Sequence, residues 1–259
     1  MAQPRRYELS DEQWDQIGGL FPNYRTGRPP KLNNRTAFNA ILWIARSGAA
    51  WRDLPEERYG SWKTVYTRFC NWRDSGLLIK IFQVLQVEPD FETISIDSTS
   101  IKAHQHSAGA KKNAELNEVK QHIGNSRGGK TTKIHTLVDG LGNPLAFLLT
   151  GGQTHDAVAT IPLLEQFEIE GSTILGDKAY GSETIRDWIS AQGGSYTIPP
   201  KSNAKNPWKV DWFLYKERHL VECFFNRIKH FRRVATRYDK LAKSFLSFVY
   251  VAAIFKLTQ

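Results

Sequence analysis

The first ninety residues repeat apolar positions at spacings of three and four, separated by short polar breaks. This spacing is typical of amphipathic helices, and it predicts helices over four stretches: 10–22, 34–47, 61–76 and 77–87. Ser10 and Gln13 have the spacing of a capping box. Ser61 is expected to cap the third helix, and Gly48 and Gly76 are expected to end helices. Short helices with basic faces resemble a helix-turn-helix DNA reader, and the alternative is a helical cap packed on a catalytic domain.

From Pro89 onward, short β-branched runs alternate with helical stretches. Strands are predicted at 93–97, 133–139, 144–150, 172–177 and 195–199. Helices are predicted at 156–167, interrupted or kinked near Pro162, and at 182–192, 215–229 and 240–257. The tract DGLGN between the second and third strands is a hairpin signal. We therefore expect an α/β mixed-sheet catalytic domain over 89–259, following a helical DNA-binding domain over 1–88.

Residues 105–130 interrupt this alternation. They are polar, rich in Gly, Lys and Asn, and show neither helical nor strand periodicity. Such a composition cannot bury enough apolar surface to order itself, so a mobile basic loop is predicted.

The stretch 215–229 has one polar face and one apolar face. At about 100° per residue, its polar stripe falls within about 60°. The stripe contains Tyr215, Arg218, Glu222 and Lys229, with Asn226 and Arg233 extending it. A carboxylate can hold a divalent cation, and nearby Arg and Lys can hold phosphate oxygens. On periodicity alone, a solvated helix face with charge pairs is the simpler interpretation.

Charge indicates the class of partner. The chain carries 35 Lys and Arg against 26 Asp and Glu, a formal net charge of +9. This excess favours a polyanion, most often nucleic acid. Lys63 and Arg68, on the outer face of the third predicted helix, are candidate DNA contacts. Arg28, in the tract RTGRPPK, is a candidate for an A·T-rich minor groove, although an ordinary linker is the simpler interpretation of that tract.

The composition also argues against other classes. Cys70 and Cys223 are the only cysteines, so neither a disulfide framework nor a Cys-rich zinc site is expected. No run of residues approaches a membrane span, and the N-terminal stretch lacks the apolar core of a secretory signal. We expect a cytoplasmic protein without a membrane partner.

Three carboxylates have related positions in the predicted domain. Asp97 and Asp177 end predicted strands, and Glu222 lies on the polar face of the helix over 215–229. Groups at the carboxyl ends of strands gather at one edge of an α/β sheet. Oxygen-only ligands favour Mg²⁺ or Mn²⁺ over Zn²⁺. The three acids could bind two Mg²⁺ ions, which activate a water or 3′-hydroxyl for phosphoryl transfer.

The spacing of these residues is similar to a known signature. Tyr215, Arg218, Glu222 and Lys229 follow the pattern Tyr, two residues, Arg, three residues, Glu, six residues, Lys. The tracts SIDST around the first aspartate and DKAY from Asp177, together with GGKTTKIH, GGQTHDA, LSDEQW and WRDLP, belong to the same pattern. The chain resembles the DDE transposases of bacterial insertion sequences, in the insertion-sequence-five group of the four/five superfamily.

The resemblance implies an RNase H-like core, Mg²⁺-dependent strand cleavage at terminal inverted repeats, and strand transfer into target DNA. It implies metal ligation by Asp97, Asp177 and Glu222. It also implies DNA contacts by Tyr215, Arg218 and Lys229. To these we add Lys178, beside the second aspartate, and Arg233, on the extended stripe. A dimer or larger assembly on transposon-end and target DNA, associated with the bacterial nucleoid, is expected.

Two other functions remain open at this point. An RNase H-like nuclease, such as a junction resolvase, would use the same metals without strand joining. A DNA-binding regulator derived from a transposase would retain the fold around a silent core, although the intact acids argue against it.

Overall fold

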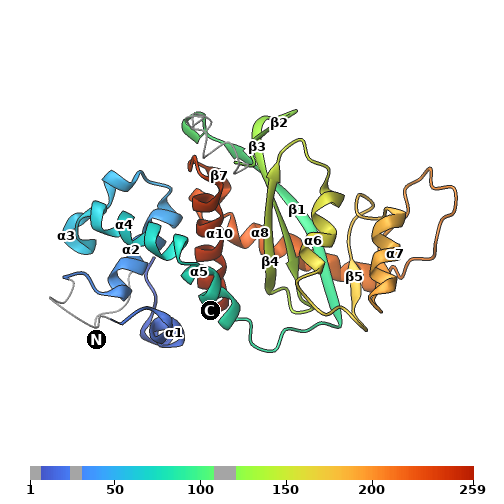
Figure 1. The fold of residues 1–259 in the computed structure, drawn as a ribbon, viewed down its shortest axis with the longest axis horizontal. Coiled ribbons are helices and arrows are strands. Elements are labelled where there is room, and N and C mark those ends of the chain that lie inside the picture. Colours follow the sequence, from blue (N-terminus) through green and yellow to red (C-terminus); the bar gives the residue numbers. More distant parts are fainter. Residues whose placement is uncertain (1–6, 24–30, 108–120) are drawn as a thin grey trace. The chain divides into compact units, whose positions relative to one another are not determined.

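The computed structural model describes residues 7–23, 31–107 and 121–259 (Figure 1). The chain divides into two compact units. The helical unit comprises 1–85 and 228–259, and the sheet unit comprises 86–227. The expected boundary after residue 88 lies close to the observed one after residue 85. Residues 228–259, which we expected in the catalytic domain, group with the helical unit instead.

The described part of the helical unit consists of helices and short helical turns. They are α1 (Asp11–Ile17), η1 (Gly18–Leu20), α2 (Asn34–Ser47), η2 (Trp51–Asp53), α3 (Glu56–Tyr59), α4 (Trp62–Asp74), α5 (Leu77–Val84), α9 (Arg232–Ala235) and α10 (Ala242–Leu257). The two-residue strand β7 (Thr236–Arg237) follows α9. The long connection between α2 and α4, which the sequence left unassigned, is thus occupied by η2 and α3.

Local signals account for most of these helix ends. The Ser10 hydroxyl accepts from the Gln13 amide at 3.2 Å, and the Gln13 side chain accepts from the Ser10 amide at 2.9 Å, which confirms the capping box. Gly48 ends α2 in the left-handed region at φ 71°. The prediction for Ser61 is wrong in its detail, because its side chain makes no capping bond. Glu56, from α3, accepts from the Trp62 amide at 3.2 Å instead.

Helix α10 is part of the core of the helical unit. It is apolar on all sides, as expected for a buried helix, and it contacts α2, α4, α5 and α9. Phe248 of α10 stacks on Phe69 of α4 with ring centroids 4.8 Å apart, and it lies 5.9 Å from the Trp51 ring. Residues distant in sequence therefore share one core.

We expect Phe248→Ala to lower the free energy of unfolding by about 3–5 kcal/mol, because it removes a fully buried aromatic ring and leaves a cavity. Urea denaturation of the full chain measures this. Val84→Ala is the matched control, since Val84 on α5 is 47 % exposed. A loss below about 1 kcal/mol for Phe248→Ala would contradict the assignment of α10 to this core.

The described part of the sheet unit contains one sheet, with both parallel and antiparallel strand pairs, and several helical elements. Its strands are β1 (Thr93–Ala103), β2 (Gly124–Ser126), β3 (Gly129–Val138), β4 (Pro144–Gly151), β5 (Thr173–Leu175) and β6 (Ser195–Thr197). Its helical elements are η3 (Gln105–Ser107), η5 (Asp156–Ala159), α6 (Thr160–Leu164), α7 (Glu183–Ala191), η6 (Leu214–Arg218) and α8 (His219–Ile228).

The strand order confirms the expected fold class. Strand β1 pairs antiparallel with β3 on one side and parallel with β5 on the other, and β5 pairs parallel with β6. The other edge of β3 is covered by β4 and, further along, by β2. An antiparallel meander followed by parallel strands is the arrangement of an RNase H-like domain.

The loop predicted over 105–130 is partly wrong. Residues 105–107 form η3, and β2 pairs with the start of β3 through a turn in which Gly129 has φ 93°. These polar strands lack apolar alternation and are ordered by pairing, which the sequence pattern does not reveal. Residues 108–120 lie outside the described residues.

Two predicted helices also differ from the observed ones. The stretch 156–167 contains the 3₁₀ turn η5 and the short helix α6. The stretch 215–229 begins as the 3₁₀ turn η6 and continues as α8 only to Ile228. Arg233 belongs to the separate helix α9, so the polar stripe does not extend to it.

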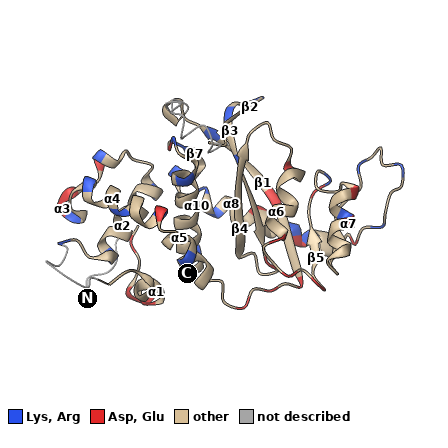
Figure 2. Ribbon diagram, viewed as in Figure 1, with Lys and Arg blue, Asp and Glu red and all other residues tan. Residues whose placement is uncertain are grey.

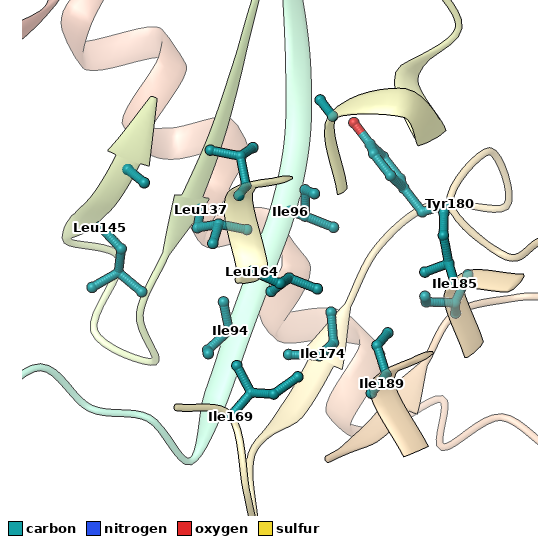
Figure 3. Packing of buried hydrophobic residues seen from close by; sticks show 14 residues of the cluster. Ile94, Ile96, Leu137, Leu145, Leu164, Ile169, Ile174, Tyr180, Ile185 and Ile189 are labelled. Atoms are coloured by element: carbon teal, nitrogen blue, oxygen red, sulfur yellow. The ribbon is translucent and has the colours of Figure 1, made fainter. Parts of the chain in front are cut away.

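The core of the sheet unit lies between the sheet and helices α6 and α7. Figure 3 shows Ile94 and Ile96 of β1 and Ile174 of β5 packed with Leu164 of α6 and Ile185 of α7. Side chains alternate between the faces of a strand. Asp97 therefore points to the face opposite this core, where β1 contacts η6.

No helix in the described ranges is long and apolar enough to cross a membrane.

Candidate active site

Asp97 lies within β1, opposite Thr136 of β3. Its carboxylate is 21 % exposed and accepts from the Ser98 amide at 2.7 Å. Burial raises the pKa of Asp97, and the neighbouring carboxylates of Asp177 and Glu222 raise it further. The Ser98 amide and Arg218 act in the opposite direction, but the net pKa is raised. Asp97 thus lies within electrostatic reach of both other predicted acids.

Asp177 follows β5 by one residue. Thr93 pairs with Thr173 and Ser95 with Leu175, so the parallel register continued by two residues sets Asp177 beside Asp97. The intervening Gly176 permits this approach, because a Cβ there would lie 3.1 Å from the Ile96 side chain.

A tight turn then orients the Asp177 side chain. Its carboxylate accepts from the Ala179 amide at 2.7 Å, and its carbonyl accepts from the Tyr180 amide at 3.0 Å. Lys178, inside this turn, is exposed. The backbone therefore holds the second acid at the sheet edge with a cation next to it.

Glu222 reaches the site from the first turn of α8. Arg218, four residues earlier, contacts the carboxylates of both Asp97 and Glu222, with its Nη1 atom 3.2 Å from Asp97 Oδ2. Burial lowers the pKa of Arg218, but the two carboxylates outweigh that effect and raise the pKa above its usual value. The guanidinium therefore bridges two of the three predicted acids and offsets part of their negative charge.

The donor set fits a hard divalent cation. The three acids present only carboxylate oxygens, the ligands that Mg²⁺ and Mn²⁺ prefer. Across residues 7–23, 31–107 and 121–259, no group of three His, Cys, Asp or Glu side chains is already arranged as a metal site. The bridging Arg218 gives a physical reason, because it contacts oxygens of Asp97 and Glu222 that a cation would take.

Tyr215, a predicted DNA contact in the sheet unit, lies next to Arg218. The Tyr215 ring is partly buried, 5.6 Å from the Trp212 ring and 5.8 Å from the Arg218 guanidinium carbon. Lys229 follows the last residue of α8 and is partly exposed. Their roles toward DNA stay predictions.

The prediction for Arg233 requires correction. This side chain is 7 % exposed, lies 3.1 Å from the Asp239 carboxylate, and donates to the Ala49 carbonyl at 2.8 Å. An arginine buried and paired in this way is not available to DNA.

The remaining candidates lie in or near the helical unit's N-terminal helices. Lys63 is exposed on α4, and Arg68, on the same helix, is partly buried and donates to the Asn34 side chain at 2.8 Å. Arg28 lies outside the described residues.

A polar network lies behind Asp97, on the other face of β1. The sequence pattern did not predict that its residues act together. Ser98, on the opposite face of β1, donates to Asp156 at 2.7 Å. Lys133 of β3 donates to the same carboxylate at 2.9 Å and to the Thr154 carbonyl at 2.8 Å. Burial would raise the pKa of Asp156, but the bonds from Lys133 and Ser98 hold it below the usual value. The sequence signals were the tracts SIDST, GGKTTKIH and GGQTHDA, which contain Ser98, Lys133 and Asp156.

Comparisons with known proteins identify the family of the chain. Residues 9–82 match the family model described as "Putative transposase of IS4/5 family". Residues 88–209 and 174–257 match two models described as "Transposase DDE domain". The matched ranges include all three acids.

Individual relatives cover part of the chain. An uncharacterized protein of Sinorhizobium fredii is 47 % identical over 40 % of this chain and 83 % of its own length. The "Putative transposase for insertion sequence element IS6501" of Brucella ovis is 36 % identical over 47 % of this chain and 94 % of its own length.

Among solved structures, the piggyBac transposase synaptic complex with hairpin DNA has a similar fold. Its TM-score is 0.54 at 10 % identity, over 96 % of this chain and 70 % of that one. The family matches, the Brucella relative and the fold together show that this chain belongs to the DDE transposases of insertion sequences, in the IS4/5 family.

Proposed function

We propose that this chain binds the terminal inverted repeats of its insertion sequence and catalyses Mg²⁺-dependent DNA strand cleavage and strand transfer. The proposal is supported by the contacts of Arg218 with the carboxylates of Asp97 and Glu222, and by the β1–β5 register, which brings Asp177 toward Asp97. Their shared electrostatic environment is the kind that catalytic carboxylates require.

The three acids would hold the metal. Two Mg²⁺ ions, or Mn²⁺ in their place, supply an activated water or 3′-hydroxyl and stabilise the leaving oxygen. The backbone of Asp97 is held by the sheet and the side chain of Asp177 by its turn. Both acids would therefore need little rearrangement to bind a metal ion. Glu222 is half exposed on α8 and is the acid with the most freedom to adjust.

The basic groups around the acids would hold the DNA end. A cation that takes the oxygens of Asp97 and Glu222 leaves the guanidinium donors of Arg218 for phosphate oxygens, to which arginine binds in a bidentate manner. Lys178 and Lys229 would add contacts to the phosphate backbone of the DNA. The Tyr215 ring would help to position the Arg218 guanidinium next to it. We propose that the active assembly contains at least two copies on paired transposon ends, in the bacterial nucleoid.

Incubation of the full chain with Mg²⁺ and a duplex carrying the inverted repeats that flank its gene tests this proposal. We expect joined products, resolved on a denaturing gel, that disappear when EDTA removes the metal. Cleavage without joining would indicate the alternative nuclease. A gel shift with neither product would indicate the alternative regulator.

A further inference from the structure

Helix α4 presents a polar face in the helical unit. Its side chains Val65, Phe69 and Trp72 are buried. On the opposite side, five residues line a groove of about 380 Å³; these are Lys63, Thr64, Thr67, Arg68 and Asn71, called here the α4 face. All of them are exposed except Arg68, which is partly buried.

The order of side chains across the α4 face is specific. At about 100° per residue, Lys63 and Arg68 lie at the two edges, and Thr67, Asn71 and Thr64 lie between them within about 140°. Short neutral hydrogen-bonding groups thus occupy the centre, and cations flank them. Thr67 and Asn71, at the centre of this face, are both exposed to solvent.

Two further hollows share residues with the α4 face, and Arg58 in one of them is paired with Glu8. Arg68 and Asn71 also line a hollow of about 610 Å³, and Thr64 and Arg68 line one of about 570 Å³ that includes Lys31 and Arg58. Among the described residues lining these three hollows, none is Asp or Glu. Figure 2 shows basic positions along α4, while acidic ones gather at α1 and α3.

One edge of the α4 face is held in place. Arg68 donates to the Asn34 side-chain oxygen at 2.8 Å, and the Asn34 side-chain nitrogen donates to the Pro22 carbonyl at 3.1 Å. This chain of hydrogen bonds limits the freedom of the guanidinium. A cation already positioned loses less conformational entropy when it binds a phosphate.

This arrangement fits the major groove of double-stranded DNA. Phosphate contacts from cations set the register of a helix, and short polar side chains read base edges. Asparagine can bond the N6 and N7 edge of adenine in a bidentate manner, and threonine can contact a base edge or the thymine methyl group. The major groove is wide enough for a helix such as α4, whose thirteen residues span about 20 Å.

We infer that α4 is the helix that reads DNA sequence, with Thr67 and Asn71 contacting base edges and Lys63 and Arg68 contacting phosphates. The inference rests on the proposed function in taking DNA as the substrate. It adds the residues that set which sequence is bound.

Selection from a library of randomised 25-base-pair duplexes by the full-length chain tests the inference. We expect the wild-type chain to enrich a motif. Asn71→Ala and Thr67→Ala should each relax preference at one or two adjacent positions, by about 5- to 100-fold against the unpreferred base. Lys63→Ala should weaken binding to all duplexes alike and reduce the salt slope by about 1.

The controls are Gln16→Ala on α1 and Lys80→Ala on α5, which remove an exposed amide and an exposed cation elsewhere in the helical unit. Both should retain the wild-type motif. An unchanged motif for the Thr67→Ala, Asn71→Ala double variant would overturn the inference, as would a wild-type chain that enriches no motif. Motif selection without strand joining in Mg²⁺ would instead support the inference and contradict the proposed function.

Discussion

Glu222→Gln is expected to reduce strand cleavage and joining by at least about a hundredfold while DNA-end binding is retained. Glutamine keeps the shape of the side chain but removes the negative charge that would help to hold a metal ion, and small errors in positioning are costly for in-line transfer. Binding should persist or tighten slightly, because a negative charge near the phosphates is lost. Rates on inverted-repeat duplex in Mg²⁺, with gel-shift affinities alongside, measure both effects.

Glu165→Gln provides the matched control, because Glu165 is an exposed glutamate elsewhere in the sheet unit. It should retain wild-type rates. Wild-type turnover by Glu222→Gln would end the assignment of Glu222 as a metal ligand. The polar side of α8 would then be a solvated face stabilised by the ion pair with Arg218, which contributes only a few tenths of a kcal/mol.

Arg218→Ala is expected to have opposite effects on metal and on DNA. Without DNA, the variant should bind Mn²⁺ severalfold more tightly than the wild-type chain, because the guanidinium no longer competes for the oxygens of Asp97 and Glu222. The gain is limited because Glu222 is half exposed and solvent screens its charge. With DNA, end binding should weaken and cleavage should slow by about a hundredfold, because the DNA end is misplaced.

Titration of the DNA-free protein with Mn²⁺, followed by electron paramagnetic resonance, measures the expected gain in Mn²⁺ affinity separately from activity. Arg227→Ala is the control, since it removes an exposed arginine from α8, the helix that follows η6. It should leave Mn²⁺ affinity near the wild-type value. Equal affinities for the wild-type and Arg218→Ala chains would show that the bridge to the two acids does not hold in solution.

Several features could be read from the sequence because their signals are local. The capping box of Ser10 and Gln13 and the left-handed Gly48 mark helix ends through bonds and angles within a few residues. The alternation of Ile94 and Ile96 identifies the core face of β1 and leaves Asp97 on the other face. The signature from Tyr215 to Lys229 was visible as spacing alone, and it led to the family that the comparisons show.

Other features depended on partners far away in the chain. The strand β2 carries no apolar alternation and is held by its pairing with β3. Arg233 looked like one more cation on a stripe, yet Asp239 and the Ala49 carbonyl bury it. Helix α10 was expected with the sheet because it follows it in sequence, but its aromatic side chains fill the helical unit.

The sequence by itself determined which carboxylates are candidates and that their chemistry suits Mg²⁺, because residue type is a local property. The prediction that a strand ends at Asp97 is wrong, since pairing with β3 continues β1 to Ala103. Only the tertiary structure decided that Arg218 bridges Asp97 and Glu222, and that Ser98, Asp156 and Lys133 form a network behind the first acid. Those contacts depend on strand register and on how η6 lies against β1. A shift of one residue in register would turn Asp97 into the core, and no pattern along the chain specifies that register alone.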